Sequence, residues 1–118
     1  MSDLHKSILT KANAAIAQGD NEAFLSFCTD DTEWTYVGDK TLQGKEAVRR
    51  YLEAAAEPPN FTVTAMIAEG GFVTALGDIT TKDQDGKRVH QSYCDVWRFR
   101  DGQMAELRAF VIQLKVKR

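Results

Sequence analysis

The spacing of apolar residues changes at Pro58 and Pro59, and this change constrains the fold more than any other feature of the sequence. Before the two prolines, apolar residues recur at steps of three and four, which is typical of amphipathic helices. After them, apolar and polar residues alternate, which is typical of half-buried strands. Because helices come first and consecutive strands follow, the sequence predicts an α+β fold with an antiparallel sheet.

Three helices are predicted before the prolines. The first covers residues 4–16 and ends at Gly19, and Asp20 is a suitable N-cap for the second. The third begins after Gly44 and ends before the prolines, which cannot continue a helix. We expect these helices to pack on the concave face of a strongly bent sheet and to leave a gap at one end.

Five strands are predicted. The first is an aromatic and β-branched segment that follows a polar turn at Asp30 and Asp31. The other four follow the prolines, and Asp101–Gly102 is the strongest hairpin signal among their connections. The predicted strands are residues 33–37, 61–67, 72–82, 89–100 and 104–115.

Composition limits the classes of function. The 118 residues suit one domain, residues 1–118, and a net charge of −2 without a basic block disfavours a nucleic-acid partner. No apolar run approaches a membrane span and no secretory leader is evident, so we expect a cytoplasmic protein without a membrane partner. Cys28 and Cys94 lie in apolar segments and are expected to be buried thiols rather than a disulfide.

No motif predicts a metal or another cofactor. His5 and His90 are far apart, and neither an HExxH nor a CxxC spacing is present. Ser92 has no neighbouring base and acid with which to form a nucleophilic triad. We therefore expect a protein that uses no cofactor.

Four segments carry the pattern of a known family. They are residues 19–34 (with Gly19–Asp20, Phe27, Asp30–Asp31 and Trp34), 44–48, 95–102 and 106–110. In order and spacing they resemble the SnoaL-like and ketosteroid-isomerase-like members of the nuclear-transport-factor-2-like superfamily, over nearly the whole chain. The resemblance implies a cystatin-like cone that encloses a pocket, and pairing of two sheets in a homodimer. It does not imply one activity, because this fold carries many functions.

Asp95 matches, by its position in the strand, the aspartate with which ketosteroid isomerase donates a hydrogen bond. Two other positions of that enzyme are not matched, because Ala12 stands for its tyrosine and Tyr36 for its general base. Ile112 replaces the acid that ends the last strand of many SnoaL-like chains. A faithful ketosteroid isomerase is therefore not expected.

Asp95 is the main candidate catalytic residue. Strict alternation places it on one face of its strand with Tyr93 and Trp97. Poor solvation among aromatic groups would raise its pKa, and a protonated carboxyl can donate a hydrogen bond to a developing enolate. The alternative is a structural aspartate that is bonded to a tyrosine, an arginine or a backbone amide.

Aromatic residues are the other candidates. Tyr36 is the candidate orienting group for catalysis, and Trp34, Tyr51, Tyr93 and Trp97 are candidate substrate-binding residues. The alternative for each is packing in the core, which is favoured for Trp34.

Two functions stay open. One is an isomerase, cyclase or dehydratase that acts through Asp95 on a small hydrophobic carbonyl compound. The other is a non-catalytic module that binds a hydrophobic ligand or dimerises. For dimerisation, an apolar patch is expected on the convex face. Its predicted members are Met66, Cys94, Val96, Phe110 and Ile112.

Overall fold

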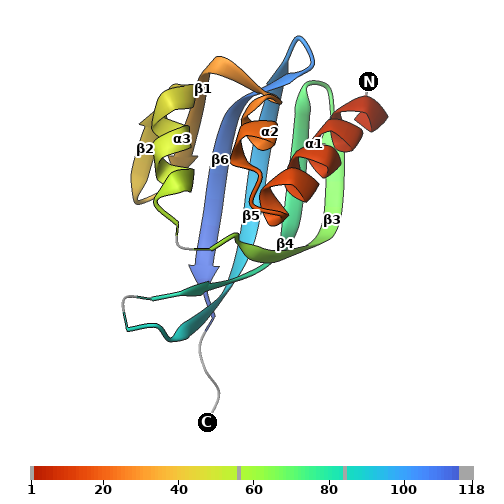
Figure 1. Cartoon of the computed structure of the whole chain (residues 1–118). Coiled ribbons are helices and arrows are strands. Elements are labelled where there is room, and N and C mark those ends of the chain that lie inside the picture. Colours follow the sequence, from red (N-terminus) through yellow and green to blue (C-terminus); the bar gives the residue numbers. More distant parts are fainter. Residues whose placement is uncertain (1, 56, 84, 115–118) are drawn as a thin grey trace.

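Three helices lie on one face of a six-stranded sheet in the computed structural model, which describes residues 2–55, 57–83 and 85–114 (Figure 1). The predicted α+β architecture is confirmed. Within these ranges, no helix has both the length and the apolar character needed to cross a membrane. The helices are α1 (Ser2–Ala17), α2 (Asn21–Leu25) and α3 (Lys45–Glu53). The strands are β1 (Cys28–Tyr36), β2 (Lys40–Gln43), β3 (Asn60–Glu69), β4 (Phe72–Lys82), β5 (Arg88–Arg100) and β6 (Gln103–Gln113).

The order of strands in the sheet is β2-β1-β6-β5-β4-β3. All neighbours are antiparallel except β1 and β6, which are parallel, so the expectation of a wholly antiparallel sheet is wrong for this pair. A parallel pair needs a long connection, and here α3 and four strands separate the two. The short strand β2 was not predicted; it pairs with β1 through a turn in which Gly38 has a φ of 86°.

The first strand starts earlier than predicted. β1 begins at Cys28, so Asp30 and Asp31 lie within a strand and not in a turn. The amide of Met104 donates to the carbonyl of Phe27 over 2.8 Å, and this bond attaches the start of β1 to β6. Arg100 also holds Asp31, with Nη2 and Oδ1 2.7 Å apart. These non-local contacts override the local preference of two aspartates for a turn.

A β-bulge in β3 changes which residues face the helices. The register with β4 shifts between Val63 and Ala65, which reverses the alternation beyond that point. Met66 therefore packs against the core on the helix-covered face, whereas Ile67 is 60% exposed on the other. The prediction that Met66 belongs to an apolar patch on the convex face is wrong for this reason.

Turn chemistry matches the prediction at the β5–β6 hairpin. Asp101 and Gly102 have φ values of 53° and 79°, the left-handed pair that a type I′ turn requires. At the first helix junction, Oδ1 of Asp20 accepts a hydrogen bond from the amide of Ala23 over 3.1 Å and caps α2. Cys28 and Cys94 are both free thiols.

Candidate functional site

One residue from each strand contributes to a straight row across the helix-covered, concave face of the sheet. Asp95 on β5 lies opposite Ala75 on β4 and Ala109 on β6. Ala109 in turn lies opposite Tyr36 on β1. We call this set the Asp95 row; in order across the sheet it consists of Lys40, Tyr36, Ala109, Asp95, Ala75 and Met66.

The carboxyl of Asp95 is half-buried and has no partner among the residues that the structure describes. Its neighbours in the row are alanines, whose side chains offer no hydrogen bond. Burial raises the pKa of Asp95 to about 7 because the charged form is poorly solvated. The arrangement gives no support to a structural aspartate that is held by a tyrosine, an arginine or an amide.

Tyr36 lies two positions from Asp95 in the row, and Tyr51 of α3 lies above it. The two phenol rings are 5.5 Å apart between centroids and tilted by 43°. Burial, together with the neighbouring Tyr51 and the carboxyl of Asp95, raises the pKa of Tyr36 above its ordinary value. Tyr36 therefore keeps its proton at neutral pH and can act as a hydrogen-bond donor.

Tyr93 has a structural partner for its hydroxyl. It donates to the backbone carbonyl of Thr62 over 2.8 Å and crosses β4 at Gly77. A Cβ at position 77 would overlap both the Thr62 carbonyl oxygen and the Tyr93 hydroxyl, so glycine is required there. The hydroxyl is thus occupied, and the residue is only 9% exposed, so the structure places Tyr93 in the core.

Trp34 and Trp97 lie next to the Asp95 row, two residues away from it along their strands and on the same face of the sheet. They form a cluster with Phe24 that we call the aromatic layer. The two indoles are 5.7 Å apart and nearly perpendicular, at 84°. Each is 4% exposed, so the structure places both in the core. The indole N–H of Trp34 is buried and has no acceptor among the described residues, a rare situation that a ligand or water would relieve.

The end of the concave face that lies away from the aromatic layer is partly exposed to solvent. Val63 lies opposite Gly77, and Val111 lies opposite Tyr93, so both share the face of Asp95. Tyr51, Val63 and Val111 are 37%, 37% and 39% exposed, and we call these three residues the open end. Apolar surface of this kind on a concave face suits contact with an apolar ligand.

Two hollows lie near the ends of the sheet, and Asp95 lines neither of them. The first, of about 330 Å³, lies at the β1–β2 turn, and Tyr36, Asp39 and Lys40 are among its lining residues. Sequence analysis missed Lys40, because the short strand that carries it has no clear periodic pattern.

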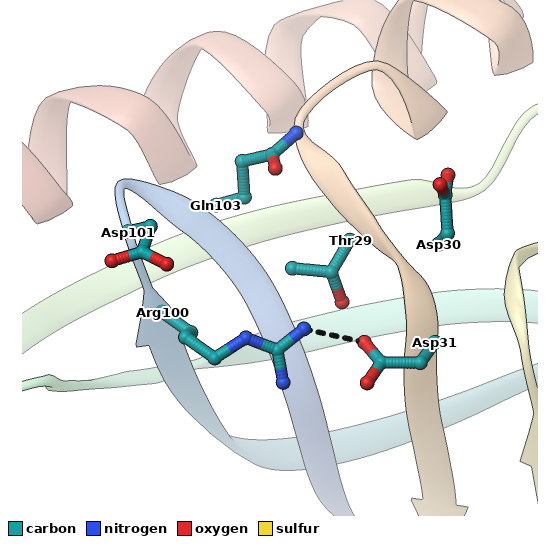
Figure 2. A pocket seen from close by; sticks show the side chains of 6 residues that line it. All are labelled: Thr29, Asp30, Asp31, Arg100, Asp101 and Gln103. Atoms are coloured by element: carbon teal, nitrogen blue, oxygen red, sulfur yellow. Dashed lines mark hydrogen bonds and ion pairs between the residues drawn. The ribbon is translucent and has the colours of Figure 1, made fainter.

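The second hollow, of about 280 Å³, is polar and lies beside the β5–β6 turn, far from the open end (Figure 2). The ion pair between Arg100 and Asp31 crosses it, and Figure 2 shows the side chain of Asp30 turned away from that pair. The hydrogen bond from Arg100 holds the pKa of Asp31 below its ordinary value. Since the guanidinium of Arg100 is already paired with Asp31, this hollow is a less suitable site than the Asp95 row.

Comparison with solved structures shows many chains of the same fold. A protein of unknown function from Cytophaga hutchinsonii, described as NTF2-like, is 24% identical, with a TM-score of 0.75 over 95% of this chain and 99% of its own. An epoxide hydrolase of M. tuberculosis described as LEH-like is 16% identical, with a TM-score of 0.82 over 93% and 84%. AclR, a putative hydroxylase from Streptomyces galilaeus, is 18% identical, with a TM-score of 0.78 over 95% and 81%. These likenesses show the fold alone.

Comparison of the sequence with curated proteins gives no match. Comparison with family models gives the SnoaL-like domain, which matches residues 9–107. That range contains the helices from Leu9 onward and all of the Asp95 row except Ala109. The resemblance noted in the sequence is thereby confirmed, and the chain belongs to the SnoaL-like domain family, with an NTF2-like fold.

Proposed function

We propose that the chain is an enzyme that moves a proton on a small hydrophobic carbonyl compound, with Asp95 as the proton carrier. The observation that carries this proposal is a half-buried carboxyl without a protein partner, whose pKa is raised to about 7. A group that titrates near neutral pH is ionised often enough to accept a proton and protonated often enough to return it.

The proposed step needs no group beyond this chain and its substrate. The ionised carboxylate of Asp95 takes a proton from the carbon next to the carbonyl, and the electron pair of that C–H bond moves to form an enolate. The phenol of Tyr36 stays neutral and donates a hydrogen bond to the enolate oxygen. In a β,γ-unsaturated carbonyl compound this enolate is conjugated with the C=C bond, so Asp95 can return the proton to the γ-carbon while the C=C bond moves to the α,β position, which completes an isomerisation. Cyclisation or dehydration would use the same enolate.

The test combines binding with turnover. Substituted phenols imitate an enolate, and fluorescence of Trp34 and Trp97, which lie next to the Asp95 row, reports their binding. Turnover is followed by absorbance, as a β,γ-unsaturated cyclic ketone becomes its conjugated isomer. We expect affinity to change with phenol acidity, and Asp95→Asn to lower turnover by about 100-fold or more while the fold remains.

Asp85→Asn, in the exposed β4–β5 turn, is the matched control and should leave both readouts unchanged. Phenol binding that ignores both acidity and Asp95→Asn would refute the proposal. So would wild-type protein that binds phenols but leaves the ketone unchanged at the rate of buffer; that second result would favour a non-catalytic binding module.

A second role, homodimerisation, is favoured by the convex face. Leu76, Cys94 and Phe110 lie side by side on β4, β5 and β6 with their side chains away from the helices. Apolar residues around them are exposed, and such a patch is typical of an interface. We call it the convex patch: Ile67 (60% exposed), Phe72 (48%), Leu76 (37%), Phe110 (38%) and Ile112 (68%).

Charges beside the convex patch suit a second copy of the chain. Asp78 on β4 and Arg108 on β6 point to the same side as the patch. In a two-fold dimer the acidic residue of one copy can face the basic residue of the other. Light scattering after gel filtration should give twice the monomer mass, and Phe110→Glu should give monomers. A wild-type monomer at high concentration would refute this role.

A further inference from the structure

The geometry points to an anion-binding subsite at Lys40, and we propose that the ligand of the Asp95 row carries a carboxylate that this lysine binds. The inference rests on the proposed function and specifies its substrate class. Lys40 occupies the β2 end of the row, opposite Tyr36, so it shares the concave face with the candidate catalytic groups.

Aromatic rings connect Lys40 to the candidate catalytic groups. The ammonium of Lys40 lies 5.1 Å from the ring centroid of Tyr51, and that ring lies 5.5 Å from the ring of Tyr36. A flat ligand that contacts the two phenols would therefore reach the ammonium at its outer end.

Lys40 is weakly paired within the protein. Its nearest carboxylate among the described residues is that of Asp39, at 3.9 Å, and the two side chains are 45% and 70% exposed. An ion pair this long and this exposed contributes little. By comparison, Arg98 and Arg100 hold carboxylates at 2.9 and 2.7 Å. The ammonium of Lys40 is thus available to a ligand carboxylate, although Asp39 offsets part of its charge.

The spacing along the row limits the length of the ligand. Lys40 and Asp95 are three strands apart, so their Cα atoms are separated by about 14 Å along the sheet. The side chain of Lys40 has a flexible four-carbon stem that can shorten this distance, and one aromatic ring with a short carboxylate arm can span what remains. The charges also set the direction of binding, because an ionised Asp95 repels the carboxylate that Lys40 attracts.

The test compares two ligands that differ in charge and little in shape, para-hydroxyphenylpropionate and its neutral amide, para-hydroxyphenylpropionamide. Their affinities are measured by titration calorimetry at neutral pH and low salt. We expect wild-type protein to bind the carboxylate about three- to tenfold more tightly than the amide. Lys40→Met should remove this preference and leave the affinity for the amide unchanged.

Lys82→Met is the matched control, since Lys82 is also exposed but lies 3.6 Å from Glu57, and it should keep the preference. Added salt should weaken the preference in wild type. Equal binding of the two ligands by wild type, or a preference that survives Lys40→Met, would overturn the Lys40 subsite and leave the proposed function in place. If wild type binds neither ligand, the Lys40 subsite falls, and the proposed function is decided by its own phenol-binding and turnover test.

Discussion

The aromatic layer and the open end belong to the same concave face but differ in how they are covered. Trp34 and Trp97 are each 4% exposed, whereas Val63 and Val111 are 37% and 39% exposed. Asp95 lies between the two regions. Along β5 it is two residues from Trp97 on one side and two residues from Tyr93 on the other. Under the proposed function, this difference would let one carboxyl be poorly solvated and still meet a ligand, because one side supplies the burial and the other the access.

The largest expected effect on stability concerns the aromatic layer. Trp97→Ala should lower the free energy of unfolding by about 3–5 kcal/mol, because a large side chain leaves a cavity among rings that cannot collapse. Val111→Ala, at the open end, should lower it by about 1 kcal/mol or less. Urea unfolding followed by far-UV circular dichroism measures both. Equal losses would show that the two regions do not differ in packing.

A smaller effect on stability is expected at Asp95, which lies between the aromatic layer and the open end, and this effect depends on pH. The pKa of Asp95 is about 7 in the folded protein and 3.8 in an ordinary setting, so the folded state binds its proton more tightly. Stability from this group is therefore complete below about pH 4, falls as the pH rises toward about 7, and is constant above that.

Asp95→Asn should remove this dependence. At about pH 8 the variant should be more stable than wild type by roughly 2 kcal/mol, after allowance for partial exposure, and near pH 4 the two should be equal. Urea unfolding across this range tests the prediction, with Asp85→Asn as control. A difference that does not vary with pH would show that Asp95 is well solvated.

The smallest expected effect on stability comes from a substitution that tests whether ligands enter at the open end. Val111→Phe adds a ring at the open end, where an exposed position should tolerate it within about 0.5 kcal/mol. If ligands enter past Val111, the same change should weaken phenol binding several-fold. Thermal unfolding and fluorescence titration of one preparation measure both quantities. Unchanged affinity would place the entrance elsewhere.

Sequence patterns predicted much of the fold because its signals are local. β4 matches its predicted bounds of residues 72–82, and the left-handed pair at Asp101–Gly102 follows from the residue types. The parallel β1–β6 pair, the strand status of Asp30 and the reversal at Met66 were missed. Each depends on contacts between distant segments or on a single bulge, which periodicity cannot show.

The candidate site was predictable only in part. Alternation along β5 indicated the face of Asp95, and the structure places it between Ala75 and Ala109. The position of Lys40 in the same row needed the register of four strands, and the bond from Tyr93 to Thr62 needed the bulge in β3. The register between strands that are distant in the chain depends on which whole faces are buried and on turn geometry, and the spacing of residues within one strand does not reveal it.

The central place of β6 has a consequence for biosynthesis. The strand lies between β1 and β5, so it joins the β2–β1 hairpin to the β5-β4-β3 meander. While the ribosome is still making β6, these two parts have no strand between them, and β1 and β5 each present an unpaired edge. Such edges can pair with other chains, so the nascent protein is expected to be most prone to aggregation just before translation of β6 is complete.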